Sequence, residues 1–353
     1  MLPPPWVRRL VIAPAVVVLA LVLLTTLPVW LLVALAASPL VPGHLRVPRL
    51  VFLAIVYIVW DAAALVCLAA LWVASGFGWK IRSPAFQRAH YVLTGRFLAA
   101  LFWVAEWSLH LSLDVVGTDP DTGMPGRPEI VVSRHAGPGD SFVLIHSLVN
   151  WFDREPRIVL KATLQWDPAV DILLNRLPNR FITPGRPGVP DLEKHVGALA
   201  SGLDDNDAFV IFPEGGNFTP HRRLRAIARL RARGLEEMAV RAEGLRNVLP
   251  PKPGGLLSAI DAAPDSGVIF VAHTGLDKLV TVADIWRELP MDKQLIMRFW
   301  SVPPEEVPAG EEERIRWLYD WWARIDAWIE ENRPQPRPLG TDWSARRTSV
   351  RSG

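Results

Sequence analysis

The sequence predicts an α/β protein with a mostly parallel sheet flanked by helices, preceded by an N-terminal transmembrane helical hairpin. The first observation is that the apolar excess of the 353-residue chain, whose mean hydropathy is +0.20, is confined to its first third. The second is that short β-branched runs alternate with helical segments from about residue 114 onward, which is typical of a parallel sheet covered on both faces. This distribution excludes a wholly soluble protein and a transporter with many spans.

Two apolar runs predict the hairpin. Residues 10–37 are almost uncharged and long enough to cross a bilayer, and residues 50–75 contain Asp61 as their only charge. A cleaved signal peptide is the competing interpretation, but the first run is longer than a signal core and the second follows at once. We expect two spans, with a shallow re-entrant hairpin as the alternative, and kinks at Pro14 and Pro28.

Basic residues beside these runs predict the orientation. Arg8 and Arg9 precede the first run, and the flank after the second run carries more lysine and arginine than the loop between the runs. Because positively charged flanks stay on the cytoplasmic side, we expect an integral membrane protein with both ends of the hairpin, and the globular part, in the cytoplasm.

A third apolar stretch, residues 97–113, is interrupted by Glu106 and His110 and carries Trp103 and Trp107 one helical turn apart. Two interpretations of this stretch stay open. It is either a helix that lies in the membrane interface, with tryptophan at headgroup level, or a core helix of the following domain. The expected division of the chain is a membrane hairpin at 1–80, an interfacial amphipathic helix and linker at 81–118, a globular domain at 119–333 and a disordered tail at 334–353.

The globular segment alternates strands and helices. Strands are expected at 129–133, 157–160, 181–183, 208–212 and 268–273, and helices at 140–151, 167–176, 191–203, 221–243 and 311–331. In the last helix Trp317, Trp321, Trp322 and Trp328 favour packing on the core, with membrane contact as the alternative. Since the ligands of parallel sheets bind beyond the carboxyl ends of the strands, the residues after each strand are the site candidates.

The segment after the 129–133 strand can form a histidine–aspartate pair. His135 follows the strand end and Asp140 comes where a helix begins, with a Gly-Pro-Gly sequence that forces a tight turn between them. In such a turn Asp140 can orient the imidazole of His135, whose other nitrogen then serves as a base. In the alternative interpretation Asp140 is a helix N-cap and His135 a surface loop residue.

The segment after the 208–212 strand is suited to an anion. Its residues are Phe212, Pro213, Glu214, Gly215 and Gly216. They lead into a helix, so glycine N–H groups and the helix dipole can face one point. Arg222 and Arg223 come close enough to reach a phosphate there, whereas a solvated basic face explains the later arginines. An apolar hairpin beside such a segment suggests an anionic lipid as the substrate.

Together these two motifs resemble the glycerophospholipid acyltransferase family, whose best-known members are the 1-acyl-sn-glycerol-3-phosphate (lysophosphatidic acid) acyltransferases. The resemblance is carried by His135 and Asp140 with four residues between them, followed by the Phe-Pro-Glu-Gly sequence that begins at Phe212. Residues 248–255 and 270–273 are similar to later segments of the family.

The resemblance implies a membrane-bound acyltransferase that transfers an acyl group from acyl-CoA or acyl carrier protein to the hydroxyl of a lysophospholipid such as 1-acyl-sn-glycerol-3-phosphate. It implies that His135 is the general base, that Asp140 orients it, and that no covalent acyl-enzyme forms. Glu214 and Gly215 would shape the acceptor site, together with the preceding Phe212 and Pro213. The resemblance implies no metal and no tightly held cofactor. The partners that it implies for the protein are the phospholipid membrane, the lysophospholipid acceptor and the acyl donor.

The chain departs from the family pattern at three places. Arg134 stands where the family has asparagine, and Gly216-Asn217 stand where it has Thr-Arg. The family arginine at the latter position is linked to the acceptor phosphate, so Arg222 or Arg223 is the candidate substitute. The family sequence Phe-Ile-x-Arg is met only in part at 181–184, with its arginine displaced to Arg186 or represented by Arg180.

Two other functions stay open. One is a protein that binds anionic lipid without catalysis, and the other is a lipid hydrolase with Ser133 or Ser141 as nucleophile, although the chain contains no Gly-x-Ser-x-Gly sequence. The net charge of +2 gives no indication of a nucleic-acid partner. The single cysteine, Cys67, excludes an intramolecular disulfide and a cysteine zinc cluster.

Overall fold

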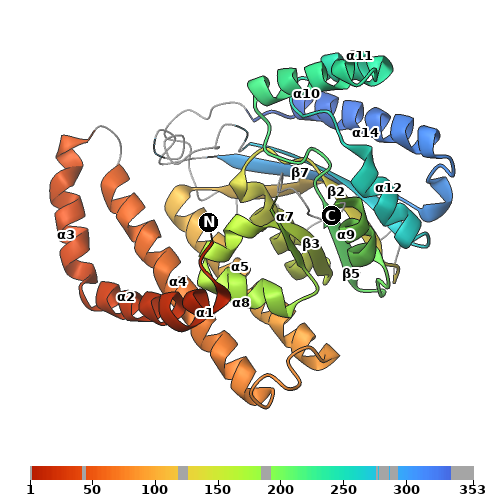
Figure 1. Ribbon diagram of the computed structural model, residues 1–353. Coiled ribbons are helices and arrows are strands. Elements are labelled where there is room, and N and C mark those ends of the chain that lie inside the picture. The colour runs from red at the N-terminus through yellow and green to blue at the C-terminus, as the bar shows by residue number, and fades with distance from the viewer. Residues whose placement is uncertain are drawn as a thin grey trace.

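The computed structural model describes residues 2–41, 45–117, 126–183, 192–275, 277, 286 and 293–334, without the side chains of 138, 140 and 192. These residues contain a seven-stranded sheet with the order β1-β7-β6-β2-β5-β3-β4 (Figure 1). Every neighbouring pair is parallel except β6 and β7, which are antiparallel. The predicted fold class, a mostly parallel sheet flanked by helices, is confirmed.

The strands have the following bounds: β1 Ser112–Val116, β2 Glu129–Ser133, β3 Glu155–Lys161, β4 Arg180–Ile182, β5 Asp207–Ile211, β6 Gly267–Thr274 and β7 Gln294–Val302. β2, β3, β4, β5 and β6 lie where the sequence predicts strands. β1 falls inside 81–118, which was expected to be helix and linker, and β7 was not expected. Both lie toward one edge of the sheet and are partly exposed, so their sequences lack the continuous apolar run of the central strands.

The central strand β2 shows how the sheet forms two cores. Ile130 and Val132 face the side covered by α9 (Leu192–Ala200), α12 (Pro253–Ala262) and α14 (Glu311–Glu331). Val131 faces the opposite side, which is covered by α5 (Pro84–Leu109) and α7 (Pro138–Asn150). Because successive side chains of a strand point to opposite faces, a run of β-branched residues fills both cores at once.

One helical prediction needs correction. The helix expected at 221–243 is two helices, α10 (Pro220–Ala232) and α11 (Glu236–Gly244). The chain turns between them at Gly234, whose φ of +74° is a left-handed conformation that favours glycine. The helix expected at 167–176 is α8 (Pro168–Arg176), which follows a 3₁₀ turn, Ala162–Trp166.

The first apolar run is also broken. It comprises a short helix α1 (Pro5–Val7), a π-helical turn Arg8–Ile12, α2 (Ala13–Thr25) and α3 (Leu27–Ala37). The break is at Thr26, because Pro28 has no N–H to continue the α2 hydrogen bonds, and α3 turns away sharply from α2 (Figure 1). The kink expected at Pro28 is therefore a full break between two helices, and the part of the run that is long enough to cross a membrane ends at Thr25.

Three helices in the described part of the chain are long and apolar enough to cross a membrane: Pro5–Thr25, Arg46–Ala74 and Pro84–Leu109. The second of these is α4, which matches the second predicted run. The third, α5, is buried on one side and exposes tryptophan on another. Leu98 and Phe102 are buried, whereas Trp103 and Trp107 are 67% and 64% exposed.

The apolar helices are attached to the globular part through α8. Asp171 of α8 is fully buried and accepts hydrogen bonds from Arg8 at 2.8 Å and Arg9 at 3.1 Å. Asp61 of α4 is buried on the same helical face as Leu68, which packs in an apolar cluster with residues of α8. Arg8 and Arg9, expected as markers of membrane orientation, thus pair with a carboxylate of the α/β fold.

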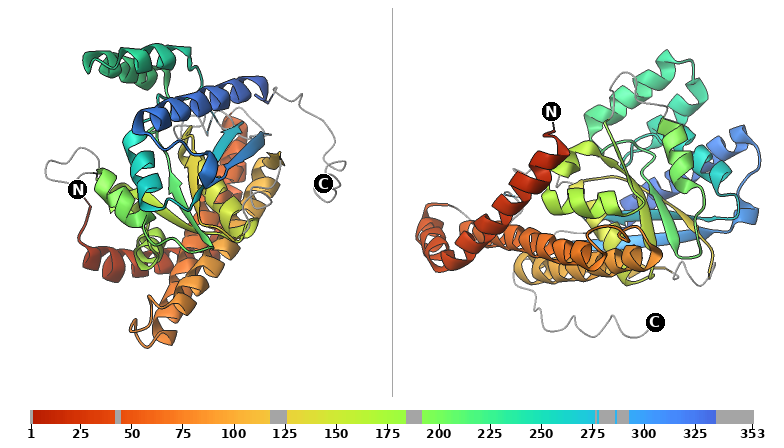
Figure 2. Two further views of the ribbon diagram at one scale, coloured as in Figure 1. Left: turned by 90° about the vertical axis from the view of Figure 1, so that its right-hand side faces the viewer. Right: turned by 60° about the horizontal axis from the view of Figure 1, so that its bottom comes forward.

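Helix α14 packs on the core, as its tryptophans predicted. Trp322 is completely buried and Trp328 nearly so, while Trp317 and Trp321 pack against the same cluster. Two further views show α14 lying over the sheet on the side away from α4 and α5 (Figure 2). Of the predicted tail, residues 335–353 lie outside the described residues.

Candidate active site

The two sequence motifs meet at one edge of the sheet. β2 lies between β5 and β6 and is parallel to both, so the residues that follow these three strands come together at their carboxyl ends. Arg134 and His135 follow β2, the Phe212–Gly215 sequence follows β5, and Gly275 follows β6. The sheet order therefore brings together segments that are far apart in the sequence.

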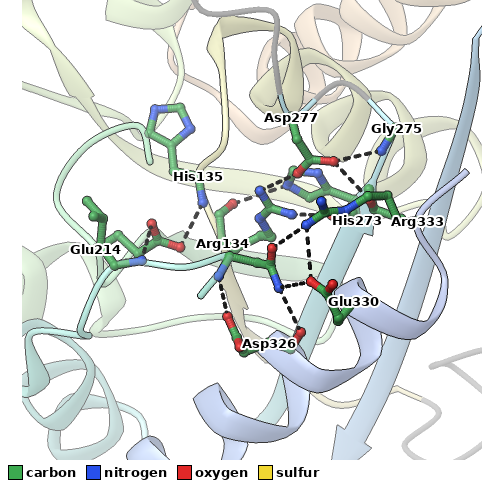
Figure 3. A network of polar contacts seen from close by, with 12 residues as sticks. Arg134, His135, Glu214, His273, Gly275, Asp277, Asp326, Glu330 and Arg333 are labelled. Carbon is green, nitrogen blue, oxygen red and sulfur yellow. Dashed lines mark hydrogen bonds and ion pairs between the residues drawn. The ribbon is translucent and has the colours of Figure 1, made fainter. Parts of the chain in front are cut away.

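His135 is held by its backbone, and its imidazole is half-buried, with Nδ1 shielded from solvent. Its N–H donates to Glu214 Oε1 at 3.2 Å, and its carbonyl oxygen accepts from the N–H of Phe218 at 2.9 Å. The half-buried imidazole lies beside the Phe212 ring, with centroids 4.9 Å apart. In Figure 3 this imidazole points away from the polar network that surrounds Arg134. A fixed backbone and a ring with one buried nitrogen hold the imidazole in one position, as a general base requires.

Glu214 connects three segments of the site. Its carboxylate is 4% exposed and accepts from His135 N–H through Oε1 and from Leu249 N–H through Oε2, each at 3.2 Å (Figure 3). A charged acceptor shared between two backbone donors fixes the distance between their loops. In the described residues Glu214 thus supports the loop that carries His135.

The turn after Glu214 places a lysine at the site. Gly215 has φ +68°, and its N–H donates to Phe212 O at 3.1 Å, which closes a tight turn. The Lys252 Nζ lies 2.6 Å from the point where a Cβ on Gly215 would be. The Lys252 side chain therefore covers the Gly215 turn, while its backbone N–H donates to Pro213 O at 2.9 Å.

Helix α14 holds the segment that contains Leu249 and Lys252. Asp326 accepts from the N–H groups of Arg246 at 2.9 Å and Asn247 at 2.5 Å, and Trp322 Nε1 donates to Leu249 O at 2.9 Å. Figure 3 shows Asp326 and Glu330 of α14 below this segment. A C-terminal helix without a predicted site residue thus positions the partner of Glu214.

Arg134 forms a buried ion pair on the other side of His135. It is 1% exposed, and its Nη2 lies 2.6 Å from Asp277 Oδ1, while its Nη1 donates to His273 O at 2.7 Å. Burial by itself would raise the pKa of Asp277, but the charge of Arg134 and hydrogen bonds from Gly275 N–H and the Thr274 hydroxyl hold that pKa at about 2. The arginine that replaces the family's asparagine therefore ties the end of β2 to the residues after β6.

The other predicted site residues have different positions. Arg222 lies at the glycine turn, with Nη1 3.1 Å from the position of a Cβ on Gly216, and it donates to Asn217 O at 3.1 Å. Arg223 instead donates to Glu243 O at 2.6 Å and so holds α11. The side chain of Asp140, in the first turn of α7, and the whole of Arg186 lie outside the described residues.

Two further features bear on the alternatives. Ser133 is buried within β2 and its hydroxyl donates to Arg134 O at 3.1 Å, which is not the exposed position that a hydrolase nucleophile needs. In the part of the chain that the structure describes, no three His, Cys, Asp or Glu side chains converge as a metal site requires.

Sequence reasoning missed Lys252, Asp277 and Asp326. Lys252 stands between two prolines in 248–255, so its place in an otherwise apolar segment is the signal that could have identified it. Asp277 and Asp326 act on residues far away in the sequence, and no local pattern marks them.

Comparison with known proteins agrees with this geometry. Residues 115–274 match the family model described as Acyltransferase. Residues 115–274 therefore form a domain of the acyltransferase type. This confirms the family that the two motifs indicated.

The crystal structure of the 1-acyl-sn-glycerophosphate (LPA) acyltransferase PlsC from Thermotoga maritima is similar, with a TM-score of 0.51 and 16% sequence identity. The match covers 83% of this chain and 100% of that chain, and at this identity it establishes the fold. No curated protein matches the chain.

Proposed function

We propose that this acyltransferase is membrane-bound and transfers an acyl group from a thioester donor to the free hydroxyl of a lysophospholipid, with 1-acyl-sn-glycerol-3-phosphate as the favoured acceptor. The observation that carries the proposal is the meeting of His135 with the Phe212–Gly215 turn at the carboxyl ends of β2 and β5. The imidazole is half-buried there, and its backbone is fixed from two sides.

The proposed reaction uses His135 as a general base. The imidazole takes the proton of the acceptor hydroxyl as the oxygen attacks the thioester carbonyl carbon. The tetrahedral intermediate then breaks the C–S bond, and the thiolate leaves with the proton that the imidazolium returns. In this scheme Asp140 orients the ring, as the family resemblance implies.

Arg222 is our candidate for the acceptor phosphate. Its guanidinium lies beside Gly216, where the family places Thr-Arg, and a guanidinium can bind two phosphate oxygens at once. Arg223 is less suited, because it is directed toward the backbone of α11. Lys252, which covers the same turn, adds a second positive charge.

The exposed side of α5 supports contact with a membrane. Trp103 and Trp107 lie there, and indole rings favour the headgroup region. Together with α2 and α4 they would hold the site at the surface of the bilayer, where the acyl chain of a lysolipid enters from the lipid phase. We propose the cytoplasmic side for the catalytic domain, on the flanking charges of the apolar runs.

The test is an acyl-transfer assay with the full-length protein in detergent, supplied with labelled acyl-CoA or acyl carrier protein and a panel of lysophospholipids. We expect transfer to lysophosphatidic acid and a fall of about 10²–10⁴ in kcat for His135→Ala. The matched control is His110→Asn, which changes a histidine before β1, three strands away from β2 in the sheet, and should retain activity.

The outcomes separate the alternatives. Full activity of His135→Ala contradicts the general-base role, and transfer to other lysolipids alone contradicts the acceptor. Lipid binding with no transfer from either donor to any acceptor would indicate a protein that binds anionic lipid without catalysis.

A further inference from the structure

Helix α10 carries a row of arginines, of which the proposed reaction uses only Arg222. Arg222, Arg225, Arg229 and Arg233 follow one another at intervals of three or four residues and therefore lie along one side of the helix. All four are exposed, and α10 contains no acidic residue. We call these four residues the arginine face.

Among the residues that the structure describes, no acidic side chain pairs with the arginine face. Arg231, on another side of α10, pairs with Glu236 and Glu243. Within the described part of the chain none of the four arginines of the arginine face forms an ion pair, and Arg225 instead contacts His221 Nδ1 at 2.7 Å. A row of unneutralised guanidinium groups attracts an anionic partner and accelerates its association.

The arginine face begins at the candidate active site. Arg222 lies beside Gly216, in the turn that also places Lys252 over Gly215. Partial burial, and then the positive charge of Arg229, lower the pKa of Lys252, so Arg229 is also close to that turn. From Arg222 to Arg233 the row extends over about 16 Å, at 1.5 Å per helical residue.

The arginine face is carried on the side of the sheet away from the apolar helices. α10 packs on α11, and α11 is joined to α14 by Arg241, which donates to Asp320 at 2.8 Å. α14 covers one face of the sheet, whereas α5 is on the other (Figures 1 and 2). If α4 and α5 contact the bilayer, α10 faces water, which favours a soluble anion over lipid headgroups.

From this placement we infer that the arginine face docks an acidic carrier protein that delivers the acyl chain as a thioester. The inference rests on the proposed function and names its acyl donor. An exposed helix is convex, and small anions such as nucleotides are bound in concave sites, whereas a second protein can lie along a row of charges of this length. A carrier docked along α10 has its thioester arm at the Arg222 end, next to His135.

The kinetic test compares acyl carrier protein with acyl-CoA bearing the same acyl chain. The variant is Arg225→Glu/Arg229→Glu, which leaves Arg222 in place. The matched control is Lys80→Glu/Arg82→Glu, an equal change of charge in the exposed turn between α4 and α5.

We expect KM for acyl carrier protein to rise about tenfold in the arginine variant and its dependence on salt to weaken, since electrostatic association is screened by ions. The control variant should stay within about twofold of the wild type. An unchanged KM for acyl carrier protein overturns the proposal, and so does an equal rise for acyl-CoA or failure to use acyl carrier protein at all.

A binding measurement separates this proposal from the proposed function. Fluorescently labelled acyl carrier protein is titrated with the full-length protein in detergent, and the wild type is compared with both variants. Arginine-dependent binding without transfer from any donor supports the docking and refutes the acyltransferase function. Transfer from acyl-CoA without binding of the carrier supports the acyltransferase function and refutes the docking. If the arginine variant loses binding to anionic lipid vesicles and keeps carrier binding, the docking proposal is wrong.

Discussion

Glu214→Gln tests whether the glutamate of the Phe-Pro-Glu-Gly motif supports the site or contacts the acceptor. In the structure its two oxygens accept from His135 N–H and Leu249 N–H, each at 3.2 Å, and the carboxylate is buried. Glutamine has the same shape, but one oxygen becomes an NH₂ group that faces a backbone donor. One charge-assisted hydrogen bond is lost and one buried N–H loses its acceptor.

The expected cost is about 2 kcal/mol in the free energy of unfolding, because hydrogen bonds to charged groups contribute about 1.5–3 kcal/mol. For a domain of this size such a loss lowers Tm by about 4–8 °C. Because the His135 loop loses one of its two backbone restraints, we also expect kcat to fall about tenfold or more, since small displacements of catalytic groups are costly. KM for the lysolipid should change little.

Thermal unfolding in detergent and initial rates with varied acceptor measure these quantities. Glu331→Gln, at the exposed end of α14, is the control and should match the wild type. The reasoning is refuted if Glu214→Gln keeps its Tm and raises KM for the lysolipid, because that result places the carboxylate on the substrate.

Two further predictions concern the residues after β6. Gly275→Ala should lower the free energy of unfolding by at least about 2 kcal/mol more than Gly202→Ala, measured by chemical denaturation. Both glycines have positive φ, but a Cβ on Gly275 overlaps the backbone oxygen of Gln294, whereas nothing lies within 4 Å of one on Gly202, so equal losses would contradict this view. The pKa of Asp277 is about 2, below the usual value of about 3.9, so its ion pair with Arg134 stabilises the fold above pH 4 and is lost as pH falls toward 2. Asp277→Asn should therefore be less stable than the wild type by about 2 kcal/mol at pH 7, and the difference should shrink between pH 4 and pH 2; a constant difference would show that the charge is not the cause.

The central sheet was predictable because its strands are buried on both faces. The apolar runs at β2, β5 and β6 identified these strands, and they are also the strands that carry the site. β7 was missed because it alternates buried and partly exposed residues and pairs antiparallel with β6. Pro28 indicated a kink in the apolar run at 10–37, but the hydropathy of the run did not show that the helix breaks completely at Thr26.

The sequence by itself determined the acyltransferase motifs, their order and the parallel sheet, because these depend on local patterns and on the strands that precede the motifs. Tertiary structure alone decided the environment of His135. Glu214 supports the His135 loop, Lys252 covers the glycine turn and Asp277 neutralises Arg134, through contacts between segments that no local spacing connects. It also placed the arginine face on the side of the sheet away from the apolar helices. The physical reason is that burial and charge pairing depend on which strand ends lie side by side, and the order of strands in the sheet differs from their order in the chain.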